Sequence, residues 1–267
     1  MSDDTILVNK GMITEIILNR PEKRNAVTLE MERRIGEILE EADRDDNVRV
    51  VTFTGNGPIF SAGHDLVEAA EVVRCDEPGN YIAKSLIQRR GQFWWPIWEF
   101  SKPTIAGVHG YVGPIANVIA GATDFCIAAE GTRFSWEQAL IGGGPGFFEP
   151  LLIGIRRAKQ VMMMDGWYSA EQGFQWGFVN KIVPADKLRE EVRAWAEKIC
   201  KYAPQQIMAN KHGINMMVEN LGLRIMAHCA LSMAATGHGS ALDKEYMELI
   251  RRSGLKAGLE FRKDAYK

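Results

Sequence analysis

The sequence lacks the features that would mark a secreted, membrane-bound or metal-binding protein. No apolar run approaches the roughly 20 residues of a membrane-spanning helix, and the acidic start, residues 1–4, lacks the basic residues that begin a signal peptide. None of the four cysteines shows C-x-x-C spacing, and the histidines show no spacing typical of metal ligands. We therefore expect a cytoplasmic protein with reduced thiols, no metal and no membrane partner.

An excess of one charge sign is also missing, because 32 basic and 34 acidic residues give a net charge of −2. A nucleic-acid partner normally requires a basic excess and is not expected, although a local cationic pocket for a phosphorylated ligand is compatible with this balance. Hydrophobic residues make up 46% of the 267 residues, enough for a sizeable core. This length suits one α/β unit with a helical extension.

Apolar patterns in the first 200 residues alternate between strand-like runs and helical periods. From Thr28 onward, apolar residues recur at helical spacing. Four short, largely apolar runs are expected to be strands: 12–18, 48–54, 104–108 and 125–129. Beyond about Pro184 helical periodicity dominates, and no further strand is expected. The sequence thus predicts an α/β layered core in residues 1–200 and a helical region in residues 201–267. The apolar segment 221–233 within it packs either against another subunit, as an oligomerisation region, or against this chain's own core.

Residues 60–66, FSAGHDL, follow a predicted buried strand and a Gly/Pro turn. Small residues there let the backbone approach a ligand, and a turn can aim an unpaired peptide N–H at it. Such an N–H stabilises an oxyanion when a second donor faces it. On their own, small-residue turns after strands are mostly ordinary turns.

A second segment, 105–116, runs from an apolar strand through Gly113 and Pro114 into small, helix-compatible residues. Proline suits the first helical turn, and the N–H groups just after it are unpaired at the positive end of the helix dipole. Segments 60–66 and 105–116 together supply the two donors that an oxyanion hole needs.

Four signatures, in order along the chain, resemble those of the crotonase (enoyl-CoA hydratase/isomerase) superfamily: NRPEKRNA at 19–26, FSAGHDL at 60–66, HGY at 109–111, and WGFV with VP between 176 and 184. The resemblance covers about residues 5–263. It implies an α/β, ClpP/crotonase-like spiral of ββα turns, followed by C-terminal helices that form a homotrimer or a dimer of trimers. It also implies an acyl-CoA thioester as substrate, with no further cofactor.

The same resemblance implies which residues form the site. The two oxyanion donors fall on the backbone N–H groups of His64 and Ile115. The family's C-terminal lysine and phenylalanine, near the CoA of a neighbouring subunit, are matched by Lys256 and Phe261. The residues implied to border the substrate or its CoA are Lys23, Arg24, Ala26, Ala62, His64, Asp65, Leu66, Ile115 and Gln138.

The chain departs from the family pattern at the positions that carry carboxylates. The family's two hydratase glutamates align with Val118 and Gln138, and an aspartate used by some isomerases and dehalogenases aligns with Gly146. Valine and glycine have no proton to exchange, and a glutamine amide does not titrate in the working range. Hydration of a 2-enoyl-CoA needs one carboxylate to activate water and one to protonate the α-carbon, so we expect it to be weak.

Three groups are candidates to replace the missing carboxylates, each with an alternative role. Glu137 neighbours a vacant position, although a shift of one residue turns a side chain to another face. Glu149 is either an acid/base or a first-turn helix carboxylate. The His64 imidazole either acts on the substrate or lines the CoA channel. The aromatic run 93–98 is either helix core or the wall of an acyl pocket, and His109 is expected to be a core histidine.

The leading interpretation is an enzyme of the enoyl-CoA hydratase/isomerase type that polarises a thioester carbonyl for enolate chemistry. One alternative is another crotonase reaction that needs fewer carboxylates, such as decarboxylation or C–C bond hydrolysis. The other alternative is a binding protein that kept the CoA cleft without catalysis.

Overall fold

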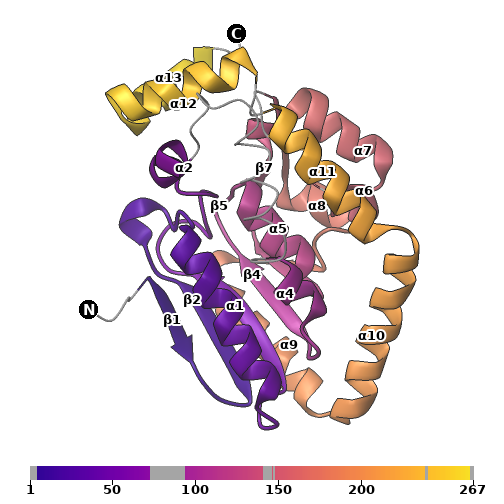
Figure 1. Cartoon of the computed structure of the whole chain (residues 1–267). Helices are drawn as coiled ribbons and strands as arrows, with labels where there is room; N and C mark the ends of the chain where they lie inside the picture. Colours follow the sequence, from indigo (N-terminus) through magenta and orange to yellow (C-terminus); the bar gives the residue numbers. More distant parts are fainter. Residues whose placement is uncertain (1–4, 73–93, 141–145, 147, 238–239, 265–267) are drawn as a thin grey trace.

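The computed structural model describes residues 5–72, 94–140, 146, 148–237 and 240–264 (Figure 1). Its strands are β1 (Ile6–Asn9), β2 (Ile13–Leu18), β3 (Val50–Gly55), β4 (Thr104–Val108), β5 (Tyr111–Val112), β6 (Phe125–Ala129), β7 (Arg133–Ser135), β8 (Trp167–Ser169) and β9 (Lys181–Val183). Its α-helices are α1 (Leu29–Arg44), α2 (Leu66–Val72), α4 (Trp95–Glu99), α5 (Pro114–Ala122), α6 (Glu149–Leu152), α7 (Ile155–Gln160), α8 (Ala170–Trp176), α9 (Leu188–Cys200), α10 (Pro204–Asn220), α11 (Leu223–Gly237), α12 (Ala241–Ser253) and α13 (Leu255–Asp264).

The centre of the molecule is a six-stranded sheet in the order β1-β2-β3-β4-β6-β9. β1 and β2 are antiparallel, and every other neighbouring pair is parallel. Parallel strands are covered on both faces and need nearly continuous apolar sequence, which the fully buried β3 provides. The four strands predicted from apolar runs are confirmed as β2, β3, β4 and β6, with ends shifted by two residues at most.

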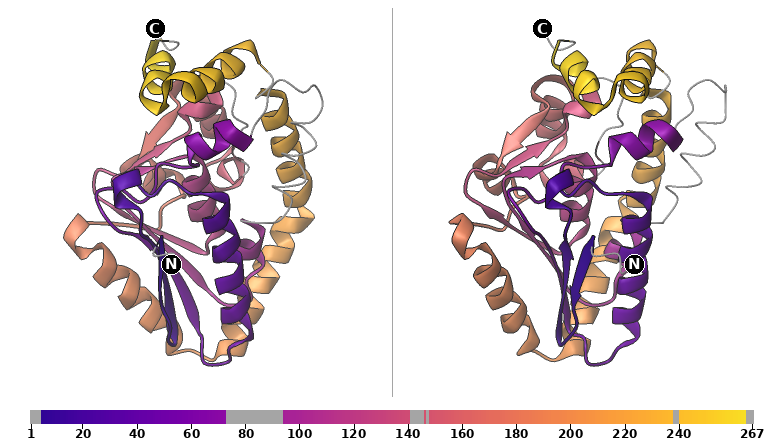
Figure 2. Two further views of the ribbon diagram at one scale, coloured as in Figure 1. Left: turned by 60° about the vertical axis from the view of Figure 1, so that its left-hand side comes forward. Right: turned by 90° about the vertical axis from the view of Figure 1, so that its left-hand side faces the viewer.

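Helices cover both faces of this sheet (Figure 2). α9 packs on the face that carries Val50, Ile105 and Ile127. The alternate strand residues point to the opposite face and form the main core with α1, α4 and α5. The start of α1 follows from Thr28, whose hydroxyl accepts the Met31 N–H at 3.2 Å and so caps the helix.

A second, three-stranded sheet has the order β5-β7-β8. The chain leaves β4, turns at Gly110, enters β5 in the small sheet and continues into α5. This ββα unit places the start of α5 beyond the ends of β3 and β4. The small-sheet strands and the edge strands β1 and β9 were not predicted, because runs of two to four residues show no usable period.

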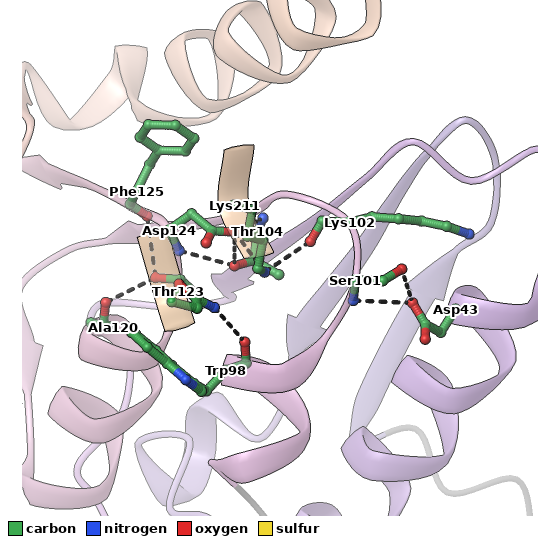
Figure 3. A network of polar contacts seen from close by, with 11 residues as sticks. Asp43, Trp98, Ser101, Lys102, Thr104, Ala120, Thr123, Asp124, Phe125 and Lys211 are labelled. Atoms are coloured by element: carbon green, nitrogen blue, oxygen red, sulfur yellow. Dashed lines mark hydrogen bonds and ion pairs between the residues drawn. The ribbon is translucent and has the colours of Figure 1, made fainter. Parts of the chain in front are cut away.

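A buried polar network attaches α10 to the sheet (Figure 3). The Lys211 ammonium on α10 donates to Asp124 Oδ2 at 2.8 Å, and the same oxygen accepts the N–H of Thr104 at 2.7 Å. The predicted change to helices is confirmed, because no strand follows β9 in the part of the chain that the structure describes. Among the described helices, none is long and apolar enough to cross a membrane.

Candidate active site

The segments that follow β3 and β4 lie side by side beyond the sheet. Ser61 and Val112 form a parallel bridge, and the Gly113 N–H donates to the Ser61 carbonyl at 2.9 Å. Segments 60–66 and 105–116, which the sequence predicts to share an oxyanion site, are therefore in direct contact.

Two glycines make this contact possible. A Cβ on Gly113 would collide with the carbonyl oxygen of Ala62. Gly63 has a φ of +104°, which L side chains rarely adopt, and its Cβ would lie 3.2 Å from Cδ of Pro114. The small residues of both segments are thus required where one backbone packs on the other.

Ile115 follows Pro114, the first residue of α5. The Asn117 N–H already bonds the Gly113 carbonyl, at 2.8 Å, at the start of this helix. No described residue accepts a hydrogen bond from the Ile115 N–H, as is usual in a first helical turn. This donor is available to a ligand at the positive end of the helix dipole.

The backbone of His64 forms a parallel bridge with Val27. The bridge uses the Gly63 carbonyl and the Asp65 N–H, both bonded to Val27. In such a bridge the N–H of the central residue points to the opposite side, here away from Val27. This orientation agrees with the predicted donor role of His64.

The imidazole of His64 has a carboxylate neighbour that the sequence did not predict. Its Nδ1 lies 3.4 Å from Oε1 of Glu32, whose side chain is only 8% exposed. A carboxylate beside Nδ1 orients the ring and determines which nitrogen carries the proton. A signal was present, because Glu32 shares the buried face of α1 with Ile35 and Leu39 at helical spacing.

Asn25 holds the donor turn in place from the neighbouring segment. It is fully buried, and its φ of +49° is one that asparagine tolerates better than most residues. Its amide donates to the carbonyls of Asn56 at 2.7 Å and Phe60 at 3.1 Å, and its own carbonyl accepts the Ser61 hydroxyl at 2.7 Å.

Replacing Asn25 with alanine should destabilise the protein by about 2–4 kcal/mol, because it leaves several buried carbonyls without a donor. Urea unfolding at fixed protein concentration measures this change. The matched control is Asn47→Ala, since Asn47 is exposed and donates to the side chain of the neighbouring Asp45; its effect should stay within about 0.5 kcal/mol. Equal effects of the two variants would show that Asn25 does not support the turn.

Two exposed cations lie beside the donor turn. The Ala62 N–H donates to the Arg24 carbonyl at 2.9 Å, which brings residues 19–26 against this turn. The side chains of Lys23 and Arg24 are exposed there. Exposed cations at the entrance of a site favour an anionic ligand group such as a phosphate.

Asp65 and Ala26 hold segments 19–26 and 60–66 together. The Arg20 guanidinium donates to the Ala26 carbonyl at 2.7 Å and to the Asp65 carboxylate at 3.1 Å. The Asp65 carboxylate also accepts the Val67 N–H at 3.1 Å, next to Leu66, which begins α2. The predicted residues of segments 19–26 and 60–66 are therefore adjacent in the fold.

A family model described as enoyl-CoA hydratase/isomerase matches residues 9–263. The chain belongs to this family. A relative of 32% identity over 219 residues is the carnitinyl-CoA dehydratase of Salmonella typhi, with 79% of this chain and 80% of the relative covered. The protein is thus a crotonase-superfamily acyl-CoA enzyme.

Solved structures of the family confirm the predicted fold class. An enoyl-CoA hydratase/isomerase from Xanthobacter autotrophicus Py2 has a TM-score of 0.87 and 28% identity, with 98% of both chains covered. An enoyl-CoA hydratase from Mycobacterium smegmatis has a TM-score of 0.89 with 98% and 94% coverage, and at 22% identity it supports the fold alone.

The three positions that the resemblance aligns with family carboxylates are Val118, Gln138 and Gly146. Val118 is buried on α5, and Gln138 lies in a 3-10 turn, Glu137–Leu140. A Cβ on Gly146 would collide with Oε2 of Glu149. The carboxylate of Glu149 thus occupies the space that the Cβ of a larger residue at position 146 would need.

Glu137 and Glu149 have opposite environments. The carboxylate of Glu137 pairs with Arg133 at 2.6 Å and with Arg262 at 3.6 Å, contacts that favour an ion-pair role. Glu149 is only 1% exposed and accepts the Trp136 indole N–H at 2.7 Å. Desolvation by burial raises the pKa of Glu149 to about 8.

The aromatic run forms a cluster around Phe148, the residue before Glu149. The rings of Trp94 and Trp98 lie 5.9 and 5.7 Å from Phe148, and Trp94 meets Trp95 edge to face at 4.7 Å. Phe93 lies outside the described residues. These contacts agree with the predicted helix-core role, and the role as the wall of an acyl pocket stays a prediction.

The remaining predicted residues make other contacts. His109 Nε2 bonds the Gly57 carbonyl at 2.9 Å, so the ring has a partner as expected, but it is half-buried and lies at the edge of the core instead of inside it. Phe261 packs against the cluster of Tyr246 and Met247 on α12, whereas Lys256 is exposed and lies 4.0 Å from Glu260. No group of three or more potential ligands for a metal occurs among the described residues.

Proposed function

We propose that this enzyme holds an acyl-CoA thioester with its carbonyl oxygen between the N–H groups of His64 and Ile115, and stabilises the enolate formed there. The observation that carries the proposal is the direct contact of the two donor turns, with the Ile115 N–H at the start of α5. Backbone donors fixed in position stabilise developing negative charge without reorganising during the reaction. The exposed Lys23 and Arg24 attract the CoA phosphates.

Calorimetric titration with butyryl-CoA and with free CoA tests this site. We expect both to bind and the thioester to bind more tightly, because only the thioester reaches the two donors. Lys23→Glu should weaken both interactions, since it reverses a charge near the phosphates. Absence of binding by either ligand would overturn the proposal.

We infer the reaction from the residues at the two positions that the resemblance aligns with the hydratase glutamates. With Val118 and Gln138 at the hydratase positions, ordinary hydration is weak, and decarboxylation or C–C bond hydrolysis suits fewer carboxylates. A non-catalytic acyl-CoA-binding role is the second candidate, supported by the same absent carboxylates. A hydration assay, a product analysis with malonyl-CoA and calorimetry together separate these functions, because the binding protein would bind thioesters and turn over none.

We also propose that the chain assembles as a homotrimer or a dimer of trimers through its C-terminal helices. α10, α11 and the turn between them present large apolar side chains to the surface: Ile214, Met216, Met217, Leu221, Ile225 and Met233. An apolar patch of this kind is costly to leave in water and is typical of a protein interface.

Light scattering at micromolar concentration should therefore give the mass of a trimer or a hexamer. Ile225→Glu should shift the protein to smaller species, because Ile225 is 70% exposed in one chain and an interface would bury the new charge. Met12→Glu, at an exposed methionine before β2, should not. A stable wild-type monomer at this concentration would refute the assembly.

A further inference from the structure

A cavity of about 410 Å³ lies at the edge of the main sheet opposite the donor turns. Its lining comes from the chain just before β3 and β4, from the ends of α1 and α9, and from the start of α10. The donor turns follow the same two parallel strands, so the length of a strand, about 16–20 Å, separates this cavity from the proposed thioester site. Small-molecule sites typically have volumes of roughly 300–1,000 Å³, so the cavity is large enough to hold a ligand.

Lys102 brings a buried cation to the lining of this cavity. The residue is only 7% exposed, and its ammonium donates to the carbonyls of Ala42 and Asp45 at the end of α1, both at 2.7 Å. Its side chain extends away from the Lys211–Asp124 pair (Figure 3), and no described carboxylate forms an ion pair with it. Carbonyl oxygens use two of its three N–H donors but do not neutralise its charge, and a buried charge without a counter-ion is costly.

Arg49 adds a second cation to the lining. Its half-buried guanidinium donates to the Tyr202 carbonyl at 2.6 Å and, within the described part of the chain, has no carboxylate as an ion-pair partner. The two aspartates of the lining are engaged elsewhere or lie in water. Asp43 accepts the N–H and the hydroxyl of Ser101, at 3.2 and 2.5 Å, and Asp46 is exposed. Both cations therefore have donors to offer an anionic ligand.

Most of the remaining lining is apolar. Val48 and Pro103 are buried, and Ile199, Ile207 and Met208 are half-buried. The first turn of α10, a helix of 17 residues, also borders the cavity, and the positive end of its dipole favours an anion. An anionic group beside the two cations, with an aliphatic chain on the apolar side chains, would match this lining.

We propose that this cavity binds an aliphatic carboxylic acid, as a site separate from the thioester site. The carboxylate accepts hydrogen bonds from the Lys102 ammonium and the Arg49 guanidinium, and its chain lies on Ile199, Ile207 and Met208. A carboxylate supplies the counter-ion that the buried ammonium lacks, and its two oxygens match the donors of a guanidinium. The inference does not depend on thioester binding.

Calorimetric titration of the full-length protein with hexanoate, hexanol and hexylamine tests the charge of the ligand. Butyryl-CoA is added in excess throughout, so that the thioester site is filled. We expect hexanoate to bind, and hexanol and hexylammonium to bind at least about 10-fold more weakly, because neither offers the cations a carboxylate. Absence of hexanoate binding, or equally tight binding of hexanol or hexylammonium, would overturn the inference.

Methyl NMR of the protein labelled at its methionine methyl groups locates the bound acid. Hexanoate should shift the signal of Met208, which lines the cavity, and leave that of Met163 unchanged, because Met163 is exposed between α7 and β8. Hexanoate binding that leaves the Met208 signal in place would show that the acid binds elsewhere, and the inference would be wrong.

Charge variants complete the test. Arg49→Met should weaken hexanoate binding about 10-fold, since it removes a charged donor and keeps a long side chain. Arg44→Met is the matched control, because Arg44 is exposed at the end of α1, pairs with Glu40 and does not line the cavity. Asp46→Asn should bind hexanoate at least as tightly as the wild type. Unchanged binding in Arg49→Met, or weaker binding in Asp46→Asn, would contradict the proposed site.

Discussion

Ile115→Pro should abolish turnover of the CoA thioester on which the wild-type protein is most active, while the protein remains folded. Proline has no N–H, so the substitution removes one of the two donors to the oxyanion outright. Loss of one such donor typically costs roughly 3 kcal/mol of transition-state stabilisation, on the order of 10²-fold in rate. Some local strain is also expected, because Pro114 precedes the new proline and a residue before proline avoids the helical region.

Three comparisons separate the donor from other effects of this change. Ile115→Ala keeps the N–H and should retain turnover within a few-fold. Circular dichroism should show the same helix content, since proline is tolerated in a first helical turn. His64→Ala should preserve CoA-ester affinity within a few-fold, because its donor belongs to the backbone. A folded Ile115→Pro variant with full activity would exclude the two-donor site.

We expect crotonyl-CoA hydration to be much slower than in a hydratase that has both glutamates, because two general acid/base groups are missing. Each general acid or base typically contributes 10²–10⁴-fold, and Val118 and Gln138 supply neither. The loss of absorbance of the conjugated thioester measures the rate directly. Turnover of ordinary hydratase magnitude would contradict this expectation.

Restoring the carboxylates gives the complementary measurement. Val118→Glu with Gln138→Glu should raise hydration only if water reaches the pocket, and either single change should raise it less. Val118 is buried in the core of α5, so the double variant needs a stability measurement beside the assay. His64→Ala assayed in parallel tests whether the imidazole, oriented by Glu32, acts as an acid/base instead.

The sequence predicted the parts of the fold that are long or chemically unambiguous. β3, β4 and β6 are buried on both faces and so read as continuous apolar runs. Pro114 and the glycine before it predicted the start of α5.

Features that depend on contacts between distant residues could not be read from the chain. The meeting of Gly113 with Ala62 requires two separate strand ends to adjoin, which no local pattern encodes. The surroundings of Glu149 depend on Trp136 and Gly146, so sequence alone left its role open between a helix-end carboxylate and an acid. The contact of Glu32 with His64 likewise joins two separate segments of the chain.

The central claim, that backbone N–H groups polarise the thioester carbonyl, is tested most directly by infrared spectroscopy of butyryl-CoA labelled with 13C at the carbonyl. Hydrogen bonds to the oxygen weaken the C=O bond and lower its stretching frequency. The account predicts a lower frequency on the wild-type protein than in water, the same shift on Ile115→Ala, and a smaller one on Ile115→Pro. An unshifted band on the wild-type protein, or an equal shift on Ile115→Pro, would contradict it.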